Sequence, residues 1–440
     1  MTTNDECTIA VCGPVDAGKS SLIGVLTSGQ LDNGKGFART KVLKHAHELE
    51  SGRTSNITFN PLIYRKNKDG IKLLSVESKK EILKVSDKEC DPGDKVISFI
   101  DLAGHEKYLK TTVFGVTGLF PDYGLVIIGA NTGITKLTRE HIGILYYLKI
   151  PLIICITKID LAPKHVYQQL CNRLKNLLTK NHFKKITYFI SDSDSKDDET
   201  NKYINDMINN IDIIPIISIS NKDGTNIKNL HSIISEIPKR KKWEKNVNDG
   251  SIVYLDNTFS VPGIGLILSG MVKGKDIKVK DKLYLGPLNG IFFQLQIRSI
   301  HNAISENVPE AKNELQCCFA IKFLNPKLTL DRKQIKKGMV LIDCLDKWKN
   351  NIVKKFSAKI TILQHSTTIK SGYSPVIHCG PIRQAAKLEL EDDVQLRSGD
   401  TCIINFSFIY HSEFMEENMI FFFRDGNTKG VGEVIKLIQQ

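Results

Sequence analysis

Two patterns of apolar and polar positions alternate through the first half of the chain. Continuous apolar runs of strand length are followed by longer segments in which apolar residues recur at helical spacing. The apolar runs predict strands over residues 7–12, 96–101, 125–130, 151–157 and 213–218. The segments with helical spacing predict helices over residues 19–28, 139–148, 165–179 and 226–236. Strands that alternate with helices in this way predict an α/β domain whose mostly parallel sheet is covered on both faces.

This alternation ends at Pro238, where the chain changes character. The basic run at residues 239–242 is interpreted as a solvated linker, with contact to phosphate as the alternative. Beyond the run, short alternating strands separated by Gly and Pro turns predict small antiparallel barrels. The predicted strands are 253–259, 266–272, 282–285 and 292–300, and, after a polar stretch at 346–355, 357–363, 374–379, 386–390, 402–410 and 419–424. The expected domains are an α/β domain over residues 1–240 and all-β barrels over residues 250–345 and 354–440.

The α/β domain opens with a glycine-rich stretch between its first strand and its first helix. Residues 13–20 read Gly-Pro-Val-Asp-Ala-Gly-Lys-Ser and fit G-x-x-x-x-G-K-[ST] in full. In such a P-loop the backbone N–H groups close around phosphates, the lysine reaches the β- and γ-phosphates, and the hydroxyl suits a magnesium ion. This predicts a nucleoside triphosphate site with Mg²⁺. The residues expected to contact the nucleotide here are Gly13, Val15, Asp16, Ala17, Gly18, Lys19, Ser20 and Ser21, with Ser20 also on the metal.

A second motif ends the predicted strand at residues 96–101. Asp101 can hold Mg²⁺ through water, and the N–H of Gly104 can bond the γ-phosphate because no Cβ blocks its approach. His105 follows directly, which predicts a position near the attacking water; an exposed loop histidine is the alternative. A lone D-x-x-G string is a weak signal, and its place at the end of an apolar strand strengthens it. We therefore assign Asp101 to the metal.

The base that the site selects is predicted from the ends of two later strands. Residues 157–160 read Thr-Lys-Ile-Asp, and the Asp160 carboxylate can accept N–H groups from guanine N1 and N2, which adenine lacks. An unmade hydrogen bond in a partly buried slot costs on the order of 1–3 kcal/mol, which favours guanine. The stem of Lys158 can cover the base, and the backbone N–H of Ser220 can donate to guanine O6. The expected contacts to GTP or GDP here are Thr157, Lys158, Asp160, Ser220, Asn221 and Lys222.

Together these residues resemble the elongation factor Tu superfamily of translational GTPases, and the GTP-binding protein one and two branch more closely. The resemblance covers nearly the whole chain. The stretches that carry it are 50–55, 99–112, 260–265, 378–380 and 382–384. It implies that the barrels correspond to domains two and three of elongation factors. It also implies that Thr54 closes on Mg²⁺ and the γ-phosphate as the switch-one threonine, and that His105 positions or activates the attacking water.

Three residues depart from the pattern of elongation factor Tu itself. Ala103 stands where proline is usual. Thr157 replaces the asparagine of N-K-x-D, which leaves open whether this position still bonds to the P-loop. Arg53 stands where an apolar residue usually helps Val15 shield the catalytic histidine, so the same apolar gate is not expected. Ala103 and Arg53 agree with the closer branch.

Composition bears on compartment and partners. The net charge of +13 attracts polyanions such as RNA, although a lysine-rich surface with no specific partner explains it too. The ten cysteines contain no C-x-x-C pair, so no zinc site is expected. Without a signal or membrane-spanning stretch, we expect a cytoplasmic monomer with no membrane partner. The charged segments 64–95 and 191–201 are predicted to be exposed loops or hairpins, the first as a surface insertion.

The predicted function is a GTP-hydrolysing switch whose partners, by resemblance, are aminoacyl-tRNA or another RNA and the ribosome. Arg383 and Lys387 could meet tRNA phosphates, and ordinary surface charge explains them equally well. One alternative is a GTP-controlled protein-binding adaptor in ribosome rescue or mRNA decay. Another is a metabolic P-loop enzyme, such as a sulfate-activating transferase subunit.

Overall fold

The structure is a computed structural model that describes residues 5–43, 57–67, 70–74, 94–180, 183–190, 205–206, 210–240, 250–365, 367–390, 394–426 and 428–439. The chain divides into two compact units. One comprises Met1–Val116 with Pro121–Arg240, and the other comprises Thr117–Phe120 with Lys241–Gln440. No helix in the described part of the chain is long and apolar enough to cross a membrane.

The first unit is built on an eight-stranded sheet within the described residues. Its strands are β1 (Asp5–Cys12), β2 (Thr58–Asn67), β3 (Gly70–Leu74), β4 (Lys95–Asp101), β5 (Tyr123–Gly129), β6 (Leu152–Thr157), β7 (Ile186–Ile190) and β8 (Ile213–Ser218). Their order across the sheet is β3-β2-β4-β1-β5-β6-β8-β7. The six strands from β4 to β7 in this order are parallel, and β2 and β3 add an antiparallel hairpin beside β4. The predicted mostly parallel sheet is therefore confirmed.

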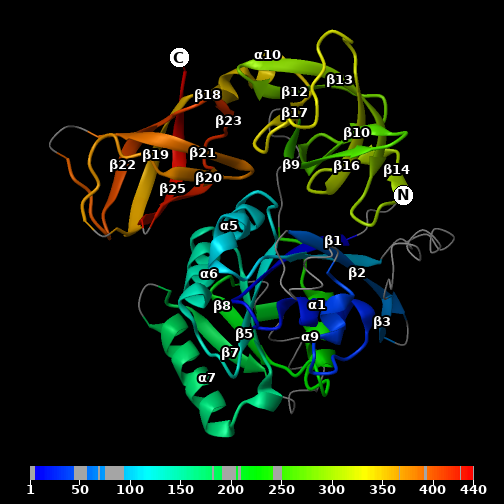
Figure 1. Ribbon diagram of the computed structural model, residues 1–440, viewed down its shortest axis with the longest axis vertical. Coiled ribbons are helices and arrows are strands. Elements are labelled where there is room, and N and C mark those ends of the chain that lie inside the picture. Colours follow the sequence, from blue (N-terminus) through cyan, green and yellow to red (C-terminus); the bar gives the residue numbers. More distant parts are fainter. Residues whose placement is uncertain are drawn as a thin grey trace. The chain divides into compact units, whose positions relative to one another are not determined.

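Helices cover both faces of this sheet (Figure 1). They are α1 (Lys19–Ser28), α2 (Phe37–Thr40), α5 (Leu109–Thr117), α6 (Lys136–Tyr147), α7 (Lys164–Thr179) and α9 (Ile227–Glu236), with 3-10 turns η2 (Glu106–Tyr108) and η3 (Ile159–Leu161). The view shows α1 and α9 on one side and α5, α6 and α7 on the other. Cys7, Ile9 and Val11 of β1 share one buried cluster with apolar residues of α1 and α9. Because side chains alternate along a strand, the residues between them face the second helical layer.

The predicted motifs lie at the carboxyl edge of the parallel strands. The P-loop follows β1, the Asp101 motif follows β4, and the two base motifs follow β6 and β8. β1 lies between β4 and β5, while β6 lies between β5 and β8. Open α/β folds bind ligands at this edge, so the topology gathers four separate sequence segments in one place.

The second unit holds two closed six-stranded barrels, as predicted for the fold class. The first consists of β9 (Ser251–Val261), β10 (Gly265–Gly274), β12 (Lys282–Leu288), β13 (Ile291–His301), β16 (Gln316–Phe323) and β17 (Val340–Ile342). The pairing of β12 with β13 closes it. The second consists of β19 (Lys355–Gln364), β20 (Val376–Cys379), β21 (Ile382–Glu389), β22 (Thr401–Phe408), β24 (Ile420–Asp425) and β25 (Thr428–Ile438).

Short elements join or flank these barrels. They are β11 (Ile277–Lys278), β14 (Asn307–Val308), β15 (Glu310–Ala311), α10 (Leu345–Trp348), η5 (Lys349–Asn351), β18 (Ile352–Val353) and β23 (Glu413–Phe414). Each barrel has its own apolar core. In the second core the rings of Phe356 and Phe406 stack with centroids 5.3 Å apart, and Phe421 meets both edge-on. Such pairs add to the stability that burial alone gives.

Candidate nucleotide-binding site

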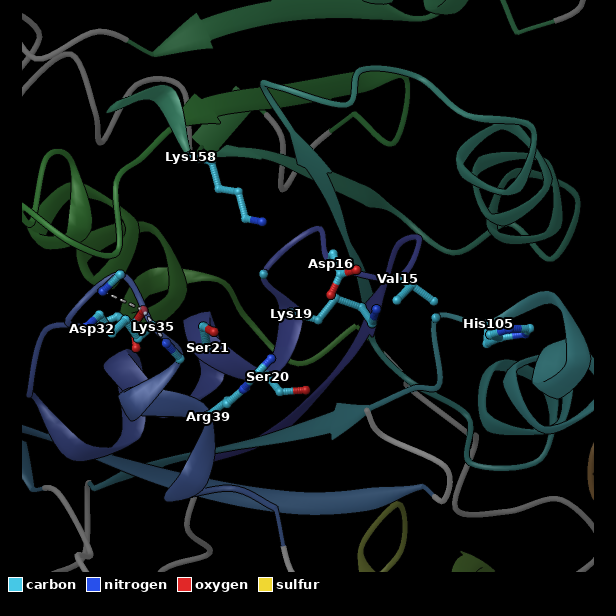
Figure 2. Close-up of a pocket in the computed structure, with 14 residues that line it drawn as sticks. Val15, Asp16, Lys19, Ser20, Ser21, Asp32, Lys35, Arg39, His105 and Lys158 are labelled. Carbon is cyan, nitrogen blue, oxygen red and sulfur yellow. Dashed lines mark hydrogen bonds between the residues drawn. The ribbon is translucent and has the colours of Figure 1, made fainter. Parts of the chain in front are cut away.

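The P-loop borders a cavity of about 290 Å³ at the carboxyl edge of the sheet. Figure 2 shows Lys158 and Asp32 at one end of this cavity and His105 at the other, with Lys19 and Ser20 between them. The predicted residues that line it are Val15, Asp16, Gly18, Lys19, Ser20, Ser21, Gly104, His105 and Lys158. Segments that follow β1, β4 and β6 therefore meet around one space. Thr54, Arg53 and the rest of the predicted switch-one segment at 50–55 lie outside the described residues.

Lys19 is the buried cation of this cavity. It opens α1, and its side chain is only 7% exposed. Its Nζ donates a hydrogen bond to the Pro14 carbonyl at 2.9 Å. Burial lowers the pKa of Lys19, and the nearby Asp101 carboxylate opposes that shift. An ammonium held out of water in this way favours an incoming anion, because the anion compensates the lost hydration.

A hydroxyl and a carboxylate lie side by side next to the cavity. The Oγ of Ser20 donates to Oδ2 of the fully buried Asp101 at 2.7 Å. Hard oxygen donors of this kind suit Mg²⁺, which takes only one or two protein ligands and completes its shell with water and phosphate. The residues present fit a magnesium ion that binds together with a nucleotide.

Gly104 and His105 form the wall opposite the base end. A Cβ added to Gly104 would stand 2.9 Å from two backbone atoms, the Gly13 carbonyl oxygen and the Pro14 carbonyl carbon, so this position has no room for a side chain. His105 is exposed, and its Nδ1 accepts the backbone N–H of Lys107 at 3.1 Å. A neutral imidazole that accepts through Nδ1 carries its proton on Nε2. In this state Nε2 is a hydrogen-bond donor.

The predicted base residues are linked to one another and to the P-loop. Thr157 is fully buried, and its Oγ1 donates to the Ala17 carbonyl at 2.5 Å. Threonine in place of asparagine therefore keeps a bond from β6 to the P-loop. The exposed Asp160 accepts a hydrogen bond from Oγ of Ser220 at 2.9 Å through Oδ1. The carboxylate is thus held next to the loop that follows β8.

The backbone N–H of Ser220, which was predicted to contact the base, already has a partner within the chain. The backbone N–H of Ser220 donates to the Thr225 carbonyl at 3.2 Å, because the chain folds back on itself after β8. That N–H is therefore not available for guanine O6. The next N–H, that of Asn221, has no hydrogen-bond partner among the described residues, and it replaces Ser220 as the candidate donor. Lys222 follows, and its N–H donates to the Ser220 hydroxyl at 3.3 Å.

A segment between α1 and α2 supplies a wall of the cavity that the sequence analysis did not predict. Its lining residues are Asp32, Gly34, Lys35, Gly36 and Arg39. The Asp32 carboxylate accepts the N–H groups of Gly34, Gly36 and Ala38 at 3.1, 3.2 and 2.8 Å, which fixes the loop. The N–H of Asp32 donates to the Asn221 carbonyl at 2.8 Å, which ties this loop to the base loop. Figure 2 shows the Arg39 side chain directed towards Ser20. The only hint in the sequence is the turn-forming string Asp-Asn-Gly-Lys-Gly at 32–36.

Comparison with known proteins places this site in a family. The model of the elongation factor Tu GTP binding domain matches residues 4–239. The chain belongs to the elongation factor Tu family of translational GTPases. GTP-binding protein 1 of Xenopus laevis is 36% identical over 444 residues, covering 99% of this chain and 64% of that protein. GTP-binding protein 2 of Homo sapiens is 33% identical over 439 residues, covering 97% of this chain and 68% of that protein. The chain thus spans about two thirds of the length of these relatives.

A solved member of the translational GTPase family has the same fold. Translation elongation factor SelB from Methanococcus maripaludis, in complex with the GTP analogue GppNHp, superposes with a TM-score of 0.67 at 19% identity. The match covers 100% of this chain and 80% of that one. The order of one P-loop domain and two barrels is therefore shared. Ala103, which stands where elongation factor Tu usually has proline, is buried. Its carbonyl accepts a hydrogen bond from the Thr112 hydroxyl at 2.8 Å.

Proposed function

We propose that this chain binds GTP together with Mg²⁺ and hydrolyses GTP to GDP and phosphate. The observation that carries the proposal is the convergence of three segments on one cavity, namely the P-loop with Lys19, the turn with Gly104, and the turn with Lys158. In P-loop GTPases such segments hold the phosphates, face the γ-phosphate and hold the base. The family membership supports this assignment.

At the phosphate end, the charges of the chain match those of the substrate. The buried ammonium of Lys19 binds the β- and γ-phosphates, and their negative charge compensates the hydration that the ammonium loses by burial. Ser20 and Asp101 are the described residues that would hold Mg²⁺, which neutralises charge on the phosphate oxygens when it is bound. The N–H of Gly104 donates to the γ-phosphate, and the absence of a side chain at this position allows that approach.

His105 is the residue that we assign to the attacking water. With Nδ1 accepting the N–H of Lys107, its Nε2–H can donate to a water oxygen or to the γ-phosphate. Its contribution is therefore orientation of the water and stabilisation of developing charge. In phosphoryl transfer these two effects provide most of the catalysis.

At the base end, guanine is selected by complementary donors and acceptors. Asp160 accepts the N–H groups of guanine N1 and N2, and the N–H of Asn221 donates to O6. Adenine reverses the pattern at both positions, so its binding leaves a carboxylate and an amide unpaired at a cost on the order of 1–3 kcal/mol each. Lys158 covers the face of the base with its methylene stem.

The same GTP cycle would act as a switch for a larger partner. Bound γ-phosphate holds the loops around it in one arrangement, and hydrolysis releases them. The partners that we propose are aminoacyl-tRNA or another RNA and the ribosome, with the chain acting as a cytoplasmic monomer. Two observations support this proposal: the solved relative is a translation elongation factor, and the net charge is +13.

The experiment is GTP hydrolysis by the full chain with and without purified ribosomes, in the presence of aminoacyl-tRNA. We expect ribosomes to accelerate turnover. His105→Ala should keep GTP affinity and lose most of the stimulated rate. His165→Ala is the matched control, because this histidine is exposed on α7 and does not line the cavity.

Two results would count against parts of this proposal. Full stimulated turnover in His105→Ala would remove the water-positioning role. GTP hydrolysis that ribosomes leave unchanged, with no GTP-dependent retention of aminoacyl-tRNA on filters, would favour the protein-binding adaptor instead.

A further inference from the structure

A second and larger cavity of the first unit lies between α7 and the loop that joins β5 to α6. Its volume is about 520 Å³. Its polar lining includes Asn131, Arg139, Gln169, Arg173, Asn176 and Lys180, and all six residues are exposed. The residues from Gln169 onward follow at intervals of four, three and four along α7 and just beyond its end, so they share one face of that helix. The cavity is therefore a polar hollow that is open to solvent.

The charge in this cavity is entirely positive. Arg139 comes from α6, while Arg173 and Lys180 come from α7 and its end. No Asp or Glu lines the cavity, and none of the three cations has an acidic partner among the described residues. The whole of α7, Lys164–Thr179, contains no acidic residue. Three unneutralised cations around one hollow are an electrostatic arrangement that favours an anion.

The side-chain chemistry favours phosphate as the anion. Guanidinium groups such as those of Arg139 and Arg173 bind phosphate oxygens through two parallel hydrogen bonds. The amides of Asn131, Gln169 and Asn176 can both donate to phosphate and accept from a ribose 2′-hydroxyl. The positive charge also continues along α7 outside the cavity, at Lys164 and Lys175. An extended charged surface suits a polyanion better than a short carboxylate-bearing segment of a protein.

We propose that this cavity is a docking site for the phosphodiester backbone of RNA on the outer helical layer of the GTPase domain. Arg139 and Arg173 each neutralise one phosphate, and the amides fix the strand without reading its bases. The inference names a surface for the RNA partner of the proposed function. It does not depend on GTP turnover, since none of its residues lines the nucleotide cavity.

The test measures binding of a fluorescein-labelled single-stranded oligouridylate to the full chain over a series of salt concentrations. The variants are Arg139→Ala/Arg173→Ala and a control, Lys164→Ala/Lys175→Ala, which removes the same charge from α7 outside the cavity. Each phosphate contact to a single strand contributes about 0.7 to the slope of log affinity against log salt concentration. We expect the arginine variant to bind several-fold more weakly at low salt, with a slope shallower by about 1.4. The control should lose less affinity and less slope than the arginine variant, because Lys164 and Lys175 belong to the charged surface but lie outside the cavity.

Three outcomes would overturn the proposal. Equal losses in the two double variants would mean diffuse attraction with no built site. An unchanged slope in the arginine variant would mean that RNA does not use this cavity. Displacement by poly-L-glutamate at lower charge concentration than by oligouridylate would assign the cavity to an acidic protein. GTP affinity measured on the same samples separates these results from a failure of the nucleotide site, because all variants should bind GTP equally.

Discussion

At the scale of single residues, the base site depends on one carboxylate with a fixed orientation. Oδ1 of Asp160 is held by the Ser220 hydroxyl at 2.9 Å, and Ser220 is in turn held by the turn that ends at Thr225. The carboxylate is therefore held beside the loop that follows β8, where we propose that it accepts the N–H groups of the base. Selectivity follows from the number of donors on that base.

Asp160→Asn should shift nucleotide preference from GTP to XTP. The new amide places a donor opposite the guanine N–H groups, whereas the carbonyl at C2 of xanthine can accept from it. Competition between GTP and XTP for the purified chain measures this shift, and we expect GTP affinity to fall by about tenfold or more. An unaltered affinity for GTP would mean that Asp160 does not contact the base.

Arg39 should set the lifetime of the bound nucleotide. Its side chain enters the cavity from the loop that Asp32 fixes, and it points towards Ser20. A hydrogen bond to a charged group contributes about 1.5–3 kcal/mol, so Arg39→Ala should speed GDP and GTP dissociation roughly 10- to 100-fold. Stopped-flow release of fluorescent GDP measures this rate.

The neighbouring cation provides the control for this measurement. Lys41 follows α2 directly, is exposed, and does not line the cavity. Lys41→Ala should leave the dissociation rates unchanged. If both variants release nucleotide at the same rate, Arg39 has no specific contact with it.

At the scale of elements, the position of α2, which carries Arg39, depends on close packing between α1 and α2. A Cβ added to Gly24 of α1 would stand 2.1 Å from the Ala38 carbonyl oxygen of α2. Gly143, in the interior of α6, has nothing within 4 Å of the same added atom. These two helical glycines therefore form a matched pair with opposite expectations.

Gly24→Ala should lower the free energy of unfolding by about 1–3 kcal/mol, because the added methyl group overpacks the contact between α1 and α2. It should also speed nucleotide release, since Arg39 moves with α2. Gly143→Ala should raise stability by about 0.5–1 kcal/mol, because alanine favours a helix more than glycine does. Thermal melts of both variants measure the pair, and a stabilised Gly24→Ala variant would contradict the packing described above.

The first barrel contains a buried acid that should make its stability depend on pH. Asp256 is 4% exposed, and burial raises its pKa from 3.8 to about 6. Between about pH 4 and pH 6 the folded state therefore binds more protons than the unfolded state, so stability falls as pH rises through this window. Above about pH 6, a pKa shift of this size lowers the free energy of unfolding by about 3 kcal/mol. The Gln316 amide donates to Asp256, and an asparagine carbonyl can accept the same bond.

Asp256→Asn should therefore stabilise the barrel unit above about pH 6 and leave it nearly unchanged near pH 4. Urea unfolding followed by tryptophan fluorescence reports this unit, because Trp348 is buried in it. A stability difference that is the same at both pH values would show that Asp256 does not titrate in this range.

The sequence predicted those elements whose apolar residues form a recognisable pattern. The helix at 19–28 and the strand at 213–218 were predicted to the residue, because a P-loop opens the one and the other is apolar throughout. β25 was not among the predicted strands. Its inward positions Gly430 and Gly432 lie against the rings of Phe423 and Phe421, where an added Cβ would stand 2.0 and 2.3 Å away. Without apolar residues at these positions, the strand shows no alternating pattern.

The segment that begins at Tyr64 was also only partly predicted. It was expected to be an exposed loop or hairpin that forms a surface insertion, and its residues 75–93 lie outside the described residues. Its first residues belong to β2, which pairs with β4 along the edge of the parallel strands, and Tyr64 is buried. β3 then completes a hairpin with β2. Because charged residues follow β2 closely in the sequence, the apolar pattern did not predict β2 as a strand of the main sheet.

At the scale of the whole molecule, the site could be predicted wherever one residue has one chemical role. Residues with one such role are those of the P-loop, Asp101, Gly104 and Lys158. The structure brings them together at one edge of the sheet. The wall formed by Asp32 and Arg39 depends on how a loop folds back on two other loops, which no local pattern encodes. The hydrogen bond from the Ser220 N–H to the Thr225 carbonyl, which leaves Asn221 as the candidate donor to the base, depends on loop folding in the same way.

The two barrels belong to a single compact unit. Ile252, Tyr254, Trp348 and Phe414 belong to a buried cluster shared by both barrels. Lys273 of the first barrel pairs with Glu416 of the second at 2.8 Å, and the Tyr254 hydroxyl donates to the same carboxylate. Removing one member of such a pair leaves a buried charge, so the link resists separation of the barrels.

The central claim is that a buried ammonium and an oriented carboxylate together make this chain specific for GTP. The direct measurement is displacement of fluorescent GTP from the full chain by GTP or ATP in the presence of Mg²⁺, with Lys19→Ala alongside. The account predicts displacement by GTP, little displacement by ATP, and loss of tight binding in Lys19→Ala. Equal displacement by ATP, or no uptake of fluorescent GTP by the unaltered chain, would contradict it.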